Sequence, residues 1–150
     1  MGNMKKTQEM LMNSIFDVFE KMFFVFLEPC DEEMKYDMIT SIEFAGSVKG
    51  DIRAYLSTGI ANFMVENMLG LGANEITDKT REDCAKEALN MIAGSFVNKL
   101  DASSVFDLSI PSYEKKSGRF GMASPGKLNL VFDSDGLFLG ISMNMVDGGK

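Results

Sequence analysis

The chain has 150 residues, 45% apolar and 25% charged, a composition typical of one globular domain and not of a disordered chain. Its net charge of −7 gives the whole chain no electrostatic footprint for nucleic acid or for an anionic membrane. The sequence contains no histidine. This excludes Ser-His-Asp and Cys-His catalysis and every metal site that needs an imidazole ligand.

The two cysteines, Cys30 and Cys84, match neither a zinc motif nor a disulfide framework, so we expect two reduced thiols. Polar residues interrupt the N-terminal segment, which therefore does not resemble a signal peptide. The longest uncharged apolar run, residues 22–27, is too short to cross a bilayer. We expect a cytoplasmic protein with no membrane segment.

The first half of the chain predicts a helix, two strands and a second helix. Apolar residues at spacings of three and four predict a helix over 7–27 that Pro29 ends. Strict alternation predicts a strand over 34–44 and another over 51–57, with a turn bracketed by Gly46 and Gly50. In the first strand the residues assigned to the apolar face are Met34, Tyr36, Met38, Ile42 and Phe44. A helix follows over 58–69, ended by Gly70 and Gly72.

The second half predicts a long helix and three more strands. The helix covers 78–100, and a short strand over 106–110 ends at Pro111. Residues 112–126 are rich in glycine and serine and are predicted as a loop. A strand over 128–132, a turn over 133–136 and a return strand over 137–145 complete the chain.

Five strands with one apolar face each favour a largely antiparallel sheet covered on that face by helices. The three predicted helices supply this cover, so we expect a two-layer α+β fold. No internal repeat or linker divides the chain. We predict one domain over 1–150, with frayed ends at 1–6 and 147–150.

The helix over 78–100 carries the most informative pattern. Asp83, Glu87, Asn90 and Gly94 form a narrow stripe opposite the apolar face. This stripe could be a merely solvated face, and Asp83 could complete a capping box begun by Thr80. However, Asn and Gly each cost a helix about 0.5–1 kcal/mol relative to Ala. The stripe is therefore a candidate contact surface, where a small residue lets another molecule approach.

The same residues resemble the signature of the CheC/CheX/FliY family of bacterial chemotaxis phosphatases. That signature is an acidic residue or Ser, three spacers, Glu, two spacers, Asn, and a downstream Pro; here these are Asp83, Glu87, Asn90 and Pro111. The segments 87–96 and 106–111 look most like CheX. The chain has one copy of the signature, which also points to CheX. The similarity extends over about 34–146. Ser95 is a departure, because many members have Asn there.

The resemblance implies a hydrolase that removes the aspartyl-phosphate of a CheY-like response regulator in two-component chemotaxis signalling. Asn90 would orient the attacking water, and Glu87 would pair with a lysine of the regulator. Asp83, Met91 and Gly94 would contact the partner. The family needs no metal or cofactor of its own, because Mg²⁺ is held in the receiver's active site. CheX proteins also form homodimers, which we expect here.

Two other functions remain open at this stage. The chain could be a catalytically silent module of the same fold that binds a receiver or a flagellar-switch partner. Its interior, rich in Phe and Met, would also suit a small-molecule sensor.

Overall fold

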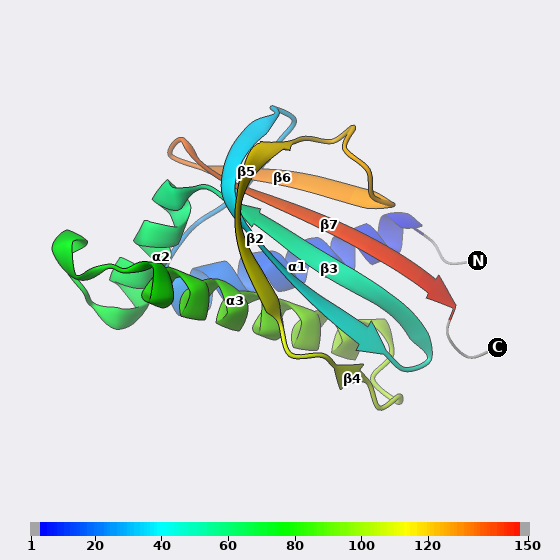
Figure 1. Ribbon diagram of the computed structural model, residues 1–150. Coiled ribbons are helices and arrows are strands. Elements are labelled where there is room, and N and C mark those ends of the chain that lie inside the picture. Colours follow the sequence, from blue (N-terminus) through cyan, green and yellow to red (C-terminus); the bar gives the residue numbers. More distant parts are fainter. Residues whose placement is uncertain (1–3, 148–150) are drawn as a thin grey trace.

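The computed structural model describes residues 4–147 and confirms the predicted α+β class, with helices packed against one face of an antiparallel sheet (Figure 1). The helices are α1 (Met4–Phe23), α2 (Thr58–Leu69) and α3 (Asp78–Leu100), with a short 3₁₀ turn, η1 (Ala73–Glu75). The strands are β1 (Glu28–Cys30), β2 (Met34–Ala45), β3 (Val48–Leu56), β4 (Asp107–Leu108), β5 (Ser112–Phe120), β6 (Leu128–Ser134) and β7 (Leu137–Asp147).

The strands run in the order β1–β6–β7–β3–β2–β4, and β5 also pairs with β2. Every pairing is antiparallel. The β6–β7 turn is the one predicted, with Asp135 and Gly136 at φ 50° and 83°, as a two-residue hairpin turn requires. Gly50, by contrast, lies inside β3 opposite Phe44 and not in a turn. A Cβ on Gly50 would lie 2.2 Å from the Asn144 carbonyl oxygen, so close packing explains this glycine.

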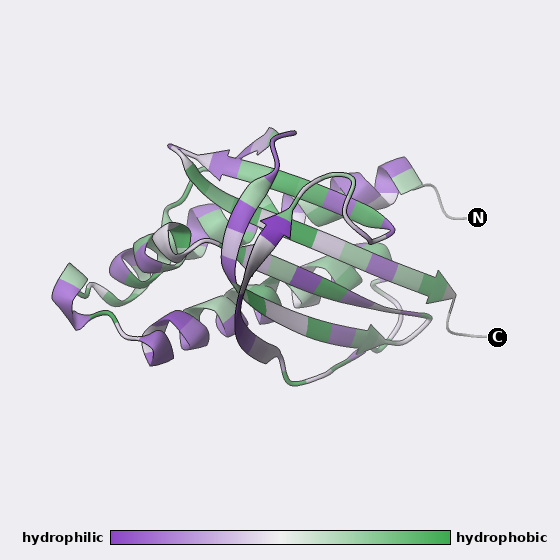
Figure 2. Ribbon diagram, turned by 45° about the horizontal axis from the view of Figure 1, so that its top comes forward, coloured by the Kyte–Doolittle hydropathy of each residue, from purple (hydrophilic) through white to green (hydrophobic). Residues whose placement is uncertain are grey.

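The main core lies between the sheet and the three helices. Apolar and polar residues alternate along the strands (Figure 2), and the inward set packs against the buried faces of α1, α2 and α3. Met34 and Tyr36 depart from this pattern: they belong to a second cluster with Phe120 and Val131. The pairing of β2 with β5 shifts register between Tyr36 and Met38, and before this point the apolar side chains of β2 lie on the outer face. There β2 and β5 curve together across the sheet (Figure 1).

Strand β5 corrects the prediction of a loop over 112–126. It pairs with β2 from Met34 opposite Phe120 to Ser41 opposite Ser112. Most of its side chains are exposed, so the sequence has no alternation to reveal a strand. Strand β1 was also not predicted, and the predicted strand over 106–110 is only the two residues of β4.

Helix α1 ends at Phe23, not near Pro29 as predicted. Phe24 takes the left-handed region at φ 54°, and the Val25 N–H donates to the Phe19 carbonyl (3.0 Å). The Asn67 side chain of α2 also donates to the Phe23 carbonyl (2.6 Å). The helix end therefore depends on a contact from a distant segment, which local periodicity cannot indicate.

Of the chain ends for which fraying is predicted, residues 4–6 belong to α1 and residue 147 to β7, and 1–3 and 148–150 lie outside the described residues. Cys30 and Cys84 are both free thiols, as predicted, and burial raises the pKa of each. Within residues 4–147, no helix has the length and apolar character needed to span a membrane.

Candidate functional site on helix α3

Helix α3 begins at a capping box formed by Thr77 and Thr80. The Thr77 hydroxyl accepts from the Thr80 N–H (3.1 Å), and the Thr80 hydroxyl accepts from the Thr77 N–H (2.9 Å). The alternative role considered for Asp83, completing a capping box begun by Thr80, is therefore not seen. Asp83 lies one turn further along and forms an ion pair with Lys79 (3.2 Å). Its carboxylate is thus exposed on the helix surface and not used to start the helix.

The buried face of α3 fixes the rotation of the helix. Its apolar residues pack under the sheet, with the Phe96 ring edge-on to that of Phe44 at a centroid distance of 6.0 Å. The buried residues are Cys84, Ala85, Ala88, Leu89, Ile92, Ala93, Phe96 and Val97. This packing turns the predicted stripe outward, as the helical wheel indicated.

The stripe is exposed where the sequence places the site. Asp83, Glu87 and Asn90 are exposed, and Met91 is 41% exposed. A Cβ on Gly94 would meet no atom within 4 Å, so the helix surface is open at that point. Ser95 instead turns toward α1, where its hydroxyl hydrogen-bonds that of Ser14 (2.9 Å). The departure from the family pattern at Ser95 therefore lies off the stripe.

Pro111 meets the stripe in one shallow hollow of about 310 Å³. Its lining residues are Asp83, Lys86, Glu87, Asn90 and Pro111. Met91 and Gly94 do not border this hollow; they continue the exposed surface beside it. The structure thus brings together the four residues of the signature, which come from α3 and from the segment before β5.

Two serines hold the Pro111 segment against β2. The Ser109 hydroxyl accepts from the Glu43 N–H (2.9 Å), and the Ser109 N–H donates to the Glu43 carbonyl (2.9 Å). On the other side of Pro111, the Thr40 hydroxyl donates to the Ser112 carbonyl (2.6 Å). Hydrogen bonds to β2 on both sides therefore hold Pro111 in place beside the hollow.

The acidic side chains around the hollow form ion pairs, except for Glu87. The acidic neighbours of Glu87 are both neutralised: Asp83 by Lys79, and Glu82 by Lys86 at 2.8 Å. Among the described residues, Glu87 and Asn90 have no ion pair or side-chain hydrogen bond. Their polar groups are available to another molecule.

Sequence reasoning missed one residue that lines the hollow and one exposed residue next to Pro111. Lys86 borders the hollow, although on the wheel it lies beside the stripe and not on it. Ile110 ends the strand predicted over 106–110, where an apolar residue is expected on the buried face, but it is 90% exposed next to Pro111. The signal for Ile110 was its position directly before a proline, where a strand is interrupted.

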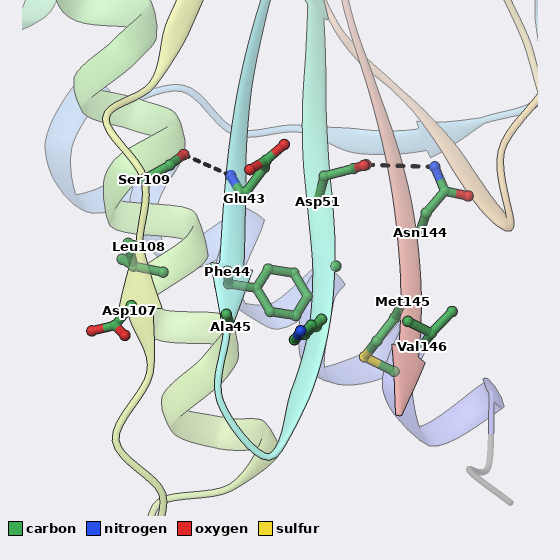
Figure 3. Close-up of a pocket in the computed structure, with 12 residues that line it drawn as sticks. Glu43, Phe44, Ala45, Asp51, Asp107, Leu108, Ser109, Asn144, Met145 and Val146 are labelled. Carbon is green, nitrogen blue, oxygen red and sulfur yellow. Dashed lines mark hydrogen bonds between the residues drawn. The ribbon is translucent and has the colours of Figure 1, made fainter. Parts of the chain in front are cut away.

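A second hollow, of about 580 Å³, lies on the sheet face away from the helices at the ends of β2, β3 and β7 (Figure 3). Its charged lining mixes Lys49 with Glu43, Asp51 and Asp107, and Asp51 accepts a hydrogen bond from Asn144 (3.5 Å). Figure 3 also shows the Ser109–Glu43 hydrogen bond that anchors the Pro111 segment. No signature residue borders this hollow. Among residues 4–147, no group of His, Cys, Asp and Glu side chains could hold a metal ion.

Comparison with known proteins identifies the family of this chain. The family described as chemotaxis phosphatase CheX matches residues 38–132, a range that contains α3 and Pro111. The chemotaxis protein CheX from Vibrio vulnificus has a TM-score of 0.79 at 19% identity, covering 97% of this chain and all of that one (100%). A CheC-like superfamily protein from Shewanella sp. PV-4 has a TM-score of 0.77 at 22% identity, covering 93% and 97% of the two chains.

A third similar structure is the CheX–CheY–BeF3–Mg complex from Borrelia burgdorferi, with a TM-score of 0.68 at 21% identity and coverage of 91% and 96%. At these identities the structural matches show a shared fold. Comparison with curated proteins gives no significant match. Because the family match covers more than half of the sequence, the chain belongs to the chemotaxis phosphatase CheX family.

Proposed function

We propose that this protein accelerates hydrolysis of the aspartyl-phosphate of a CheY-like response regulator. One observation carries this proposal. Glu87 and Asn90 lie exposed beside Pro111 without side-chain partners, in a member of the chemotaxis phosphatase CheX family. A solved relative bound to CheY supports the choice of partner. This chemistry also requires no histidine, which the chain lacks.

Asn90 orients the attacking water in this proposal. The water oxygen attacks phosphorus, and the bond from phosphorus to the aspartyl oxygen breaks with its electron pair on that oxygen. The products are a free aspartate carboxylate and inorganic phosphate. A carboxamide suits this role because it both accepts from and donates to water, whereas a carboxylate would repel the phosphoryl oxygens.

Glu87 supplies the docking contact, an ion pair with a lysine of the regulator. Its neighbours Asp83 and Glu82 already pair with lysines of this chain, so Glu87 is the carboxylate left for a partner's cation. It lies close to one helical turn before Asn90, so this contact also sets how deeply Asn90 enters the receiver's active site.

The surface around the pair suits contact with a protein. Asp83, Met91 and Gly94 extend it along α3, and Gly94 leaves room for the receiver's backbone to approach. Ile110 adds an exposed apolar contact next to Pro111. We place Mg²⁺ in the receiver's active site and propose no cofactor for this chain. We further propose that it acts in the cytoplasm as a homodimer, which light scattering at micromolar concentration would test.

The direct test is single-turnover decay of a phosphorylated receiver with excess protein and Mg²⁺. We expect decay to be faster than the receiver's own rate and to release inorganic phosphate. If no cognate receiver decays faster but one binds, the protein is instead a silent binding module of this fold.

A further inference from the structure

A second surface of the molecule combines exposed aromatic rings with unneutralised acidic residues. It surrounds a hollow of about 350 Å³, and its residues are Phe24, Phe26, Phe63, Glu28, Asp133 and Asp135, which we call the Phe24 surface. It shares no residue with the hollow on α3.

Phe24 and Phe26 face outward because their chain neighbours are buried in the core. Val25 and Leu27 are buried, whereas Phe24 and Phe26 are 63% and 67% exposed. Phe63, half-buried on α2, lines the same hollow. Single exposed apolar residues are common, but adjacent exposed aromatics beside a hollow are typical of an interaction site.

The backbone at Phe24 takes the left-handed conformation that ends α1, but ending the helix does not require a phenylalanine at this position. Its φ of 54° suits glycine or asparagine, and an aromatic residue rarely adopts it. The Phe24 side chain is mostly exposed, so core packing does not explain why a phenylalanine occupies this position. A phenylalanine in a conformation that favours glycine therefore carries strain that core packing does not offset, which is a feature of functional sites.

The acidic residues of this surface lack cations within the described part of the chain. Glu28 in β1 lies directly opposite Asp133 in β6, and like charges opposite one another destabilise a strand pair. Asp135 lies in the turn that follows. None of the three forms an ion pair with a lysine or arginine of residues 4–147. A cation from another molecule would therefore be favourable here.

We propose that the Phe24 surface binds a basic segment of a protein partner, one that carries arginine or lysine beside an apolar side chain. Cations bind carboxylates and also the faces of aromatic rings, and the apolar side chain would cover the exposed phenylalanines. A second copy seated through the same surface is a poor occupant, because it would bring its own Glu28, Asp133 and Asp135 against these three carboxylates. This site is separate from the one proposed for the receiver.

The test uses protein labelled with fluorophenylalanine and a synthetic peptide of arginine and leucine, with a matched peptide of glutamate and leucine as control. We expect the arginine peptide alone to shift the ¹⁹F resonances of Phe24, Phe26 and Phe63, assigned from single Phe→Leu variants. Phe24→Gly and Phe26→Ser should each weaken binding on the order of tenfold. Glu28→Gln with Asp133→Asn should weaken it and reduce its dependence on salt.

Met122 is exposed away from this surface, so Met122→Ala is the matched control and should bind the arginine peptide as the wild type does. Phe24→Gly should keep or raise the melting temperature, because it relieves the left-handed strain; a clear fall would make Phe24 structural and overturn the proposal. The proposal would also be overturned if the arginine peptide did not bind, or if it bound the wild type and the phenylalanine variants equally. If Phe24→Gly and Phe26→Ser instead split a dimer, a second copy covers this surface. Receiver dephosphorylation is measured separately, and its failure would leave this result intact.

Discussion

The two faces of α3 differ in what holds them and in what they leave free. One face is apolar and buried against the sheet, where Phe96 packs on Phe44. The other carries Glu87 and Asn90, which have no side-chain partner among the described residues. The buried face therefore determines stability, and the exposed face is available for a partner. Substitutions on the two faces should separate folding from activity.

The largest effect on folding is expected for Phe96→Ala. Phe96 is fully buried, and removing a buried ring costs about 3–5 kcal/mol in the free energy of unfolding, because a cavity remains. Urea denaturation would measure this loss. Asn98→Ala, on the exposed part of the same helix, should change stability by about 0.5 kcal/mol or less. Equal effects of the two substitutions would contradict the division between faces.

Asn90→Ala should reverse this pattern, with little change in stability and a large loss of activity. Losing one interaction made only in the transition state costs about 3–4 kcal/mol, on the order of a hundredfold or more in rate. The measurement is single-turnover decay of the phosphorylated receiver, with Asn98→Ala as the matched control. Receiver binding should be largely retained. Wild-type decay by Asn90→Ala would show that another group positions the water.

Glu87→Ala should weaken receiver binding as well as turnover, because the proposed ion pair sets docking. We expect roughly a tenfold loss of affinity, within the range for a charged interface pair. Titration of the receiver, with decay at saturating protein, separates the two effects. Asp83→Asn is the control: this carboxylate already pairs with Lys79 and should matter less. A larger effect at Asp83 would reassign the docking contact.

The sequence predicted α3 well because its signals are local. Its predicted bounds, 78–100, coincide with those observed, and the apolar period placed Asp83, Glu87 and Asn90 on the exposed face. The position of Pro111 beside them depends on pairing with β2, which no local pattern shows. The family resemblance, not periodicity, linked Pro111 to the stripe.

The failures share one cause, which is dependence on distant residues. Strand β5 forms because β2 supplies its hydrogen bonds, although its own side chains lack alternation. Helix α1 ends early because Phe24 turns the chain and Asn67 binds the helix end. Met34 lies on the outer face, where it packs with Phe120 of β5 and Val131 of β6. Propensity and periodicity are properties of short segments and cannot report these contacts.

The smallest expected effect concerns the exposed link between β5 and the start of α3. Lys115 hydrogen-bonds the Asp78 carboxylate (2.9 Å), which lowers the pKa of Asp78, and the nearby Arg81 adds to this. Because the folded pKa lies below the unfolded one, the stabilisation is present above about pH 4 and is lost as the pH falls through the folded pKa. Melting temperatures of the wild type and Asp78→Asn should therefore differ slightly at pH 6, by about one or two degrees, and converge once the pH falls below the folded pKa of Asp78. Lys115→Gln should give the same small difference, and the double variant no more than either alone. A pH-independent gap would mean that Asp78 acts through the helix start and not through Lys115, because an exposed pair that stabilises the fold by its charge must lose its effect when the carboxylate is protonated.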